Sequence, residues 1–149
     1  MRPTSLIGNR FRVDEIYEVT LPMGWITYKS DRFRAKSPFD NLQFSISNFS
    51  KPIATIDLDG VAKDLHQNSS QLFDKFVSEG GYVAYNDRDF QKDYAYQAFQ
   101  VDEETQYYFY TFRTFGKKVY RINFILREVA PYDPARKQLL FDIAQSIVQ

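Results

Sequence analysis

The sequence predicts an α+β domain: an antiparallel β-sheet with a long C-terminal meander, packed against one or two central helices and a C-terminal helix. Three observations predict this class. Short segments near both ends alternate apolar and polar residues, the middle and the C-terminus show a helical period, and short turns join the last three strand segments. A length of 149 residues predicts one domain.

The first half of the chain is predicted to be a lead-in followed by strands. Residues 1–10 are polar and mixed, so we expect them to be loose and the single domain to occupy residues 11–149. Imperfect alternation over Phe11–Leu21 predicts one strand, which Pro22 ends because proline cannot donate to a β-ladder. The clearest alternation, over Leu42–Ser47, predicts a strand with one buried face. Shorter strands are expected at Ile26–Tyr28 and Arg32–Lys36.

The middle of the chain carries a helical period. Two groups of apolar residues at i, i+3, i+4 and i+7 predict one long helix or two short ones between Asp57 and Glu79. Asp57 and the pair Asn68-Ser69 are plausible N-caps, and the two glycines after Glu79 supply the stop.

The C-terminal helix is predicted to begin at Asp133-Pro134, where an N-cap residue precedes a proline. An apolar stripe predicts its buried side. The stripe consists of Leu139, Leu140, Ile143, Ala144, Ile147 and Val148.

The second half of the chain predicts long antiparallel strands. A two-residue loop at residues 116–117 pairs positions whose numbers sum to 233, so Phe109 faces Phe124. Tyr108 then lies on the opposite face, opposite Ile125. The strand signals fall at Tyr82–Tyr85, Tyr94–Val101, Gln106–Thr114 and Val119–Arg127.

The aromatic residues of this meander define the candidate binding surface. The face of Phe124 is predicted to be the core, because its strand alternates with polar residues. The other face is either covered by more protein or is a recognition surface rich in tyrosine with arginine beside it, and both interpretations stay open. Under the second, the candidate partner-binding residues are Tyr94, Tyr96, Tyr108, Tyr110, Phe112 and Arg121.

The composition excludes several kinds of chemistry. The chain has no cysteine, which excludes disulfides, thiolate metal sites and cysteine nucleophiles, and its single histidine, His66, excludes a zinc site built on several histidines. Nineteen basic residues balance nineteen acidic ones, which argues against a nucleic-acid binder. No Walker, GxSxG, GxGxxG or HExxH motif occurs. We expect no catalytic residue, no metal and no cofactor.

The charged clusters are interpreted as surface features. Acidic groups within residues 57–64 and 87–93 lack the pattern of a calcium loop. A basic group could face an acidic partner or phosphates, but interspersed acidic residues favour a salt-bridged sheet edge. This basic group is Arg10, Arg12, Lys29, Arg32, Arg34 and Lys36.

Apolar runs and the N-terminus predict the compartment. No apolar run is long enough to span a membrane, and residues 1–9 lack the apolar core of a signal peptide. We expect a cytoplasmic protein, or a periplasmic one whose signal peptide has been removed.

The segment Tyr17–Trp25 contains a strand followed by Pro-x-Gly-Trp, and with the order of the elements it resembles PsbP-like domains. The resemblance covers residues 11–149 in outline. That superfamily includes extrinsic photosystem proteins, a Ran-binding nuclear transport factor and bacterial chaperone-like adaptors for type VI secretion effectors. The resemblance implies a binding scaffold that works through protein partners.

Three hypotheses about function follow. The first is a non-catalytic protein-binding module, such as a bacterial adaptor, chaperone or immunity protein, with a secreted effector or toxin as a candidate partner. The second is a small-molecule-binding or enzymatic domain with an aromatic-lined pocket. The third is a structural domain of an assembly, including a homodimer through the aromatic face.

Overall fold

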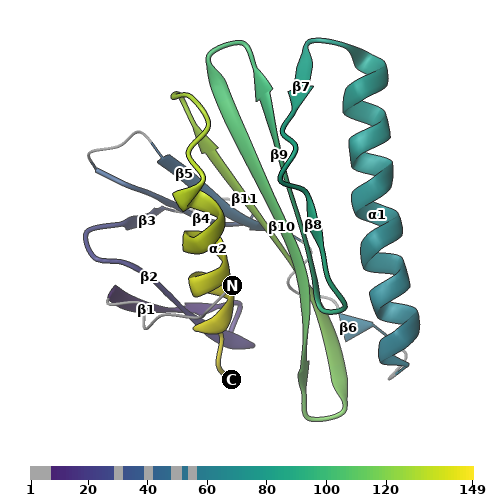
Figure 1. Ribbon diagram of the computed structural model, residues 1–149. Coiled ribbons are helices and arrows are strands. Elements are labelled where there is room, and N and C mark those ends of the chain that lie inside the picture. Colours follow the sequence, from purple (N-terminus) through teal and green to yellow (C-terminus); the bar gives the residue numbers. More distant parts are fainter. Residues whose placement is uncertain (1–7, 29–31, 39–41, 48–51, 54–56) are drawn as a thin grey trace.

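The computed structural model describes residues 8–28, 32–38, 42–47, 52–53 and 57–149. It has the predicted α+β class, with two helices among these residues (Figure 1). The first half contributes the strands β1 (Gly8–Val13), β2 (Tyr17–Pro22), β3 (Ile26–Tyr28), β4 (Phe33–Lys36), β5 (Leu42–Ser47) and β6 (Pro52–Ile53). The second half contributes α1 (Leu58–Glu79), β7 (Tyr82–Ala84), β8 (Asp89–Phe90), β9 (Tyr94–Val101), β10 (Glu104–Phe115), β11 (Lys118–Glu128) and α2 (Ala135–Gln145).

The C-terminal meander forms the centre of the main sheet. Its strands are ordered β3-β4-β5-β11-β10-β9-β7, with β6 paired to β11 and β8 to β9, and every pairing is antiparallel. Phe115 pairs with Lys118 and Phe109 with Phe124, which confirms the predicted register. This register fixes which side chains share a face, because side chains alternate along a strand.

The two faces of the sheet are covered by different elements (Figure 1). The β1–β2 hairpin and α2 pack on the face of Phe124, and α1 packs on the other face over β7, β9 and β10. Ser146 joins the hairpin to the C-terminal segment, because its Oγ accepts a hydrogen bond from the Thr20 N–H at 2.9 Å.

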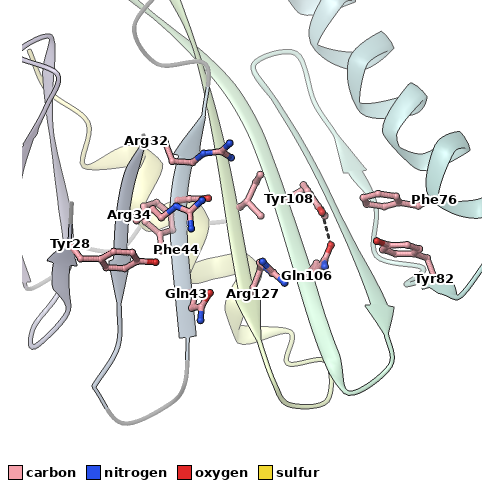
Figure 2. Close-up of a pocket in the computed structure, with 12 residues that line it drawn as sticks. Tyr28, Arg32, Arg34, Gln43, Phe44, Phe76, Tyr82, Gln106, Tyr108 and Arg127 are labelled. Carbon is pink, nitrogen blue, oxygen red and sulfur yellow. Dashed lines mark hydrogen bonds between the residues drawn. The ribbon is translucent and has the colours of Figure 1, made fainter. Parts of the chain in front are cut away.

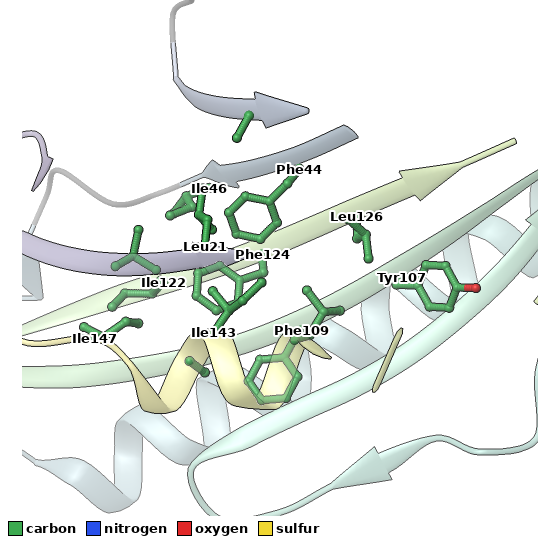
Figure 3. Close-up of a cluster of buried hydrophobic side chains, with 14 of the residues drawn as sticks. Leu21, Phe44, Ile46, Tyr107, Phe109, Ile122, Phe124, Leu126, Ile143 and Ile147 are labelled. Atoms are coloured by element: carbon green, nitrogen blue, oxygen red, sulfur yellow. The ribbon is translucent and has the colours of Figure 1, made fainter. Parts of the chain in front are cut away.

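The main core lies under α2 and the hairpin (Figure 3). Leu21, Phe44, Phe109, Phe124 and Ile143 are at most 1% exposed. Burying a large apolar side chain completely stabilises the folded state by about 1.5–3 kcal/mol, so this cluster is a main source of stability.

The first strand prediction is wrong in two respects. Phe11–Leu21 is a hairpin rather than one strand, because Asp14 and Glu15 adopt left-handed φ angles of 48° and 59° and reverse the chain. Strand β1 also begins at Gly8, so residues 8–10, which were predicted to be part of a loose lead-in, belong to a strand. Residues 1–7 lie outside the described part of the chain.

The helices follow the prediction closely. The segment after Asp57 is one helix, and the Asp57 carboxylate accepts from the Gly60 N–H as an N-cap. The second candidate cap, Ser69, lies inside α1 instead, where its hydroxyl donates to the Leu65 carbonyl. Helix α2 begins at Ala135, one residue later than predicted, and the Ala135 N–H donates to the Asp133 carboxylate. The helix ends at Gln145, so Ile147 and Val148 of the predicted stripe lie beyond it, and Val148 forms a β-bridge with Glu18.

Candidate functional site

The predicted aromatic surface is partly covered by α1. Tyr108 is 8% exposed, and its ring lies 5.7 Å from the ring of Phe76 on α1. Farther along the sheet, the Arg121 guanidinium lies 3.5 Å from the Asp64 carboxylate of the same helix. Of the two interpretations left open, coverage by more protein applies to this half of the face.

Tyr110 and Phe112 also lie beneath α1. They share the face of Tyr108, as the register predicted, and both are partly buried. With Val61 and Leu65 of α1 they line a gap of only about 10 Å3. Their position supports helix docking rather than an open surface.

Tyr94 and Tyr96 are on the other face, so the expectation that they lie beside Tyr108 is wrong. Tyr96 pairs with Phe109 and Tyr94 with Thr111, whereas Tyr108 pairs with Gln97. Tyr96 is fully buried, and Tyr94 stacks on Phe109 at 5.1 Å.

A polar cluster surrounds these two tyrosines. The Asp89 carboxylate accepts from Tyr94 Oη at 2.6 Å and lies 2.9 Å from Lys137 Nζ of α2. Burial alone would raise the pKa of Asp89, but hydrogen bonds from Tyr94, Gln91 and Lys137, with the charge of Lys137, lower it to about 2. Asp89 therefore holds β8, β9 and α2 together as a carboxylate.

The open part of the α1 face lies beyond the helix, over β3, β4, β5 and β11. The registers align one residue from each strand in a single line, because Tyr28 pairs with Arg34, Arg34 with Ser45, Ser45 with Ile125 and Ile125 with Tyr108. We call these five residues the cross-strand row. Directly opposed side chains in a sheet lie about 4.5–5.5 Å apart at Cβ, so the row is continuous.

A cavity of about 310 Å3 lies over the cross-strand row (Figure 2). We call it the sheet groove. Phe76 and Tyr82 stand at its α1 side and Tyr28 at the β3 side. Besides the row, its lining includes Arg32, Gln43, Phe44, Phe76, Tyr82, Gln106 and Arg127.

The aromatic side of the groove is held by ring stacking and a hydrogen bond. Phe76 and Tyr82 stack face to face, with ring centroids 4.2 Å apart and planes 5° from parallel. Tyr108 donates a hydrogen bond to Gln106 Oε1 at 2.6 Å, and burial raises its pKa. Tyr108 therefore stays a neutral phenol, fixed at the groove floor.

On the arginine side of the groove, the structure defines the ion-pair contacts of Arg127. Arg127 is 52% exposed, and its Nε and Nη2 groups bond the two oxygens of the Glu104 carboxylate. Gln106 Nε2 donates to the same carboxylate at 3.2 Å. The hydrogen bond from Arg127 is the main cause that lowers the pKa of Glu104. This pairing holds the guanidinium in one orientation at the rim.

Part of this site could be predicted from the sequence. Arg34 belongs to the basic group that was interpreted as a salt-bridged sheet edge, and here it lies in the groove lining. Ile125 was predicted to lie opposite Tyr108 but was not named as a site residue, and Ser45 was missed, although alternation within its strand places it on the face opposite Phe124. Arg127 was also missed, and the signal for it was its position two residues after Ile125 on the same face.

The other candidate groups have structural roles. His66 Nε2 hydrogen-bonds the Gln91 carbonyl, and its ring stacks on Phe90 at 5.6 Å. Within the ranges that the structure describes, no three histidine, aspartate or glutamate side chains are placed to hold a metal ion. No helix in the same ranges is long and apolar enough to cross a membrane.

Comparison with known proteins adds no family to this description. The chain matches no protein-family model, and no curated protein matches its sequence.

Proposed function

We propose that this protein is a non-catalytic binding module that holds a segment of a protein partner in the sheet groove. The observation that carries the proposal is the groove itself, where tyrosines and arginines surround a cavity on the half of the sheet face beyond α1. Tyrosine and arginine are enriched among residues that dominate protein–protein binding energy, because both combine a large contact area with hydrogen bonding.

The dimensions of the groove favour an extended segment. From β3 to β10 the sheet order has four strand-to-strand steps, which at about 4.8 Å each gives a row about 19 Å long. An extended chain advances about 3.3 Å per residue, so about six residues span the row.

A small-molecule site is the second candidate. Small-molecule pockets have volumes of about 300–1,000 Å3, and the groove, at about 310 Å3, reaches the lower limit. Its lining extends across five strands rather than closing around one point, and this favours the protein segment.

The biological role stays a proposal with the same alternatives. An adaptor, a chaperone and an immunity protein each act by binding another chain, which the groove could do, and a secreted effector or toxin remains a candidate partner. Membership of the PsbP-like superfamily and a cytoplasmic location also stay predictions. A homodimer through the groove is the competing interpretation of the same surface.

A peptide-display selection tests the proposal. A library of random linear peptides is selected against the native protein, and the enriched peptides are measured against Ser45→Trp, which fills the groove floor. Thr114→Trp is the matched control, because it places the same side chain on the same sheet face near the far end of β10. Tyr28→Ala removes an exposed ring and serves as a second groove variant.

We expect peptides that bind the native protein and Thr114→Trp but lose at least about tenfold in affinity, which is about 1.4 kcal/mol, on both groove variants. Failure to enrich any peptide, or equal binding to the groove variants, would overturn the proposal. Light scattering of the native protein separates the competing dimer: a dimer that Ser45→Trp converts to a monomer would assign the groove to a second copy.

A further inference from the structure

We propose that helix α1 is a hinged cover, which undocks from the sheet as a unit while the main core under α2 stays folded. Undocking uncovers the aromatic face around Tyr108 and joins it to the sheet groove. This inference goes beyond the proposed function, because it concerns how α1 is held and needs no partner. It arises from the composition of the surface between α1 and the sheet.

The two faces of the sheet have cores of very different size. Among the described residues, the cluster under α2 and the β1–β2 hairpin contains twenty buried residues, whereas the cluster under α1 contains three. These three are Phe76, Phe99 and Tyr108. Nearer its start, α1 buries the smaller apolar side chains of Val61, Ala62 and Leu65. Hydrophobic stabilisation scales with the apolar area removed from water, so α1 is held less firmly than the elements on the other face.

The middle of α1 lies on polar side chains. Ser69 of α1 and Gln97 of β9 are each 1% exposed, and Gln97 Nε2 donates to the Ser69 carbonyl at 2.8 Å. Gln97 Oε1 is also buried, and it has no hydrogen-bond partner among the described residues. A buried acceptor without a partner has lost its hydrogen bonds to water, which disfavours the docked position of α1. Undocking returns this oxygen to water.

The flanks of α1 are held by contacts that do not compensate for the small core. Asp64 of α1 pairs with Arg121 of β11, but the two side chains are 54% and 39% exposed, and ion pairs this open to solvent contribute little. The guanidinium of Arg88 lies 4.1 Å from the centre of the Phe73 ring. That contact joins α1 to the segment between β7 and β8 rather than to the long central strands.

The C-terminal end of α1 is built as a hinge. Gly80 and Gly81 connect it to β7 with left-handed φ angles of 76° and 77°, and nothing lies within 4 Å of the position that a Cβ atom would take at either glycine. Glycine populates positive and negative φ about equally well. These two residues can therefore change conformation at little cost while β7 keeps its pairing with β9.

The position of α1 sets the extent of the sheet groove. Tyr108 belongs both to the cross-strand row and to the cluster under α1, and Phe76 stands at the α1 side of the groove (Figure 2). When α1 undocks, the groove floor continues past Tyr108 to Gln97 and Phe99 of β9, which lie on the same face.

Chemical modification of a single thiol tests the inference. The native chain has no cysteine, so an introduced cysteine is the only thiol. Ser69→Cys places it under the middle of α1. Ala98→Cys is the matched control, because Ala98 is also 1% exposed and follows Gln97 on β9, but belongs to the main core on the other face. Each full-length variant is treated with iodoacetamide in urea below its unfolding transition, and circular dichroism measures its global unfolding.

We expect the Ser69→Cys thiol to react at least about tenfold faster than global unfolding allows, because local opening exposes it while the main core stays folded. The Ala98→Cys thiol should react only at the rate that global unfolding allows. Reaction of both thiols at the global rate would overturn the hinged cover.

Gln97→Met tests the cause in the Ser69→Cys background. Methionine has a similar length without an amide, so the unpartnered acceptor is removed, while the Ser69 carbonyl keeps its hydrogen bond within the helix. We expect the thiol to react about tenfold more slowly. Gln67→Met makes the same replacement on an exposed position of α1 and should leave the rate unchanged. Equal rates with and without Gln97→Met would overturn the role of the buried amide.

Native-state hydrogen exchange of the unsubstituted protein gives a second measurement that depends on no variant. We expect the amides of α1 to exchange through an opening that depends less steeply on urea than the opening that exposes β10 and β11, because less surface is uncovered. The same steep dependence for α1, β10 and β11 would overturn the hinged cover even if a cysteine variant failed to fold.

Discussion

The carboxylate of Asp89 is predicted to make folding stability depend on pH through its contacts with Tyr94 and Lys137. Replacing Asp89 by asparagine keeps the size of the side chain but removes its charge. The ion pair to Lys137 at 2.9 Å is lost, and the hydrogen bond from Tyr94 becomes one to a neutral amide. Both partners are partly buried, with side-chain exposures of 21% for Asp89 and 22% for Lys137.

The magnitude follows from the pKa of Asp89, which is lowered from 3.8 to about 2 in the folded protein. One pKa unit corresponds to about 1.4 kcal/mol, so the shift corresponds to about 2 kcal/mol, and solvent screening reduces this to about 1–2 kcal/mol. Because the folded-state pKa is below the unfolded one, this stability is complete above about pH 5 and lost as the pH falls toward 2. Roughly half of this contribution to stability is lost by pH 3.

Urea denaturation followed by circular dichroism at several pH values from 7 to 3 measures this effect. We expect Asp89→Asn to be less stable than the native protein at pH 7 by about 1–2 kcal/mol, with a difference that shrinks toward pH 3. Asp74→Asn, on an exposed position of α1, is the control and should show no such trend. A difference between Asp89→Asn and the native protein that stays constant over this range would refute the role assigned to the Asp89 carboxylate.

Two further substitutions test the packing of the helices. Phe76→Ala removes the ring that docks α1 on the sheet and should lower the free energy of unfolding by about 3–5 kcal/mol. Val77→Ala is the control, because that side chain is 53% exposed, and it should change the free energy of unfolding by less than about 0.5 kcal/mol. Urea titration measures both variants, and equal effects would contradict the docking of α1 through Phe76. Arg113→Met removes a hydrogen bond of 2.9 Å to the Ala144 carbonyl near the end of α2. We expect the free energy of unfolding, measured by thermal unfolding, to fall by about 1–3 kcal/mol. Lys118→Met is the control and should change it little.

The elements with local signals were predictable from the sequence. The alternation over Leu42–Ser47 and the register that pairs Phe109 with Phe124 are both confirmed. A two-residue turn fixes the pairing of the strands that it joins, and the pairing fixes their faces. The position of α1 was equally predictable, because Asp57 caps it and glycines follow it.

The faces of β9 were also within reach of the sequence. An even number of turn residues between β9 and β10 pairs Tyr96 with an odd-numbered residue of β10, which places it on the side of Phe109. The observed turn has two residues, Asp102 and Glu103, and Asp102 adopts a left-handed φ of 52°. Whether the number of turn residues is even or odd was therefore enough to place Tyr96 and Tyr108 on opposite faces of the sheet.

The remaining features depend on contacts that no local pattern encodes. The turn at Asp14 and Glu15 is left-handed without the glycine or asparagine that normally indicates it. The sheet groove exists because α1 covers β7, β9 and β10 but not β5 and β4. Which part of an aromatic face a helix covers is decided by tertiary packing, so the sequence defined the face around Tyr108 without locating its open half.

The most direct test of the groove as the binding surface is a two-dimensional amide NMR titration with a peptide from the display selection. The account predicts that chemical-shift changes cluster at Ser45, Ile125 and Tyr108 and at their neighbours across the row, while amides of α2 and of the β1–β2 hairpin stay unchanged. Changes centred on α2 or the hairpin, with the row unaffected, would contradict it.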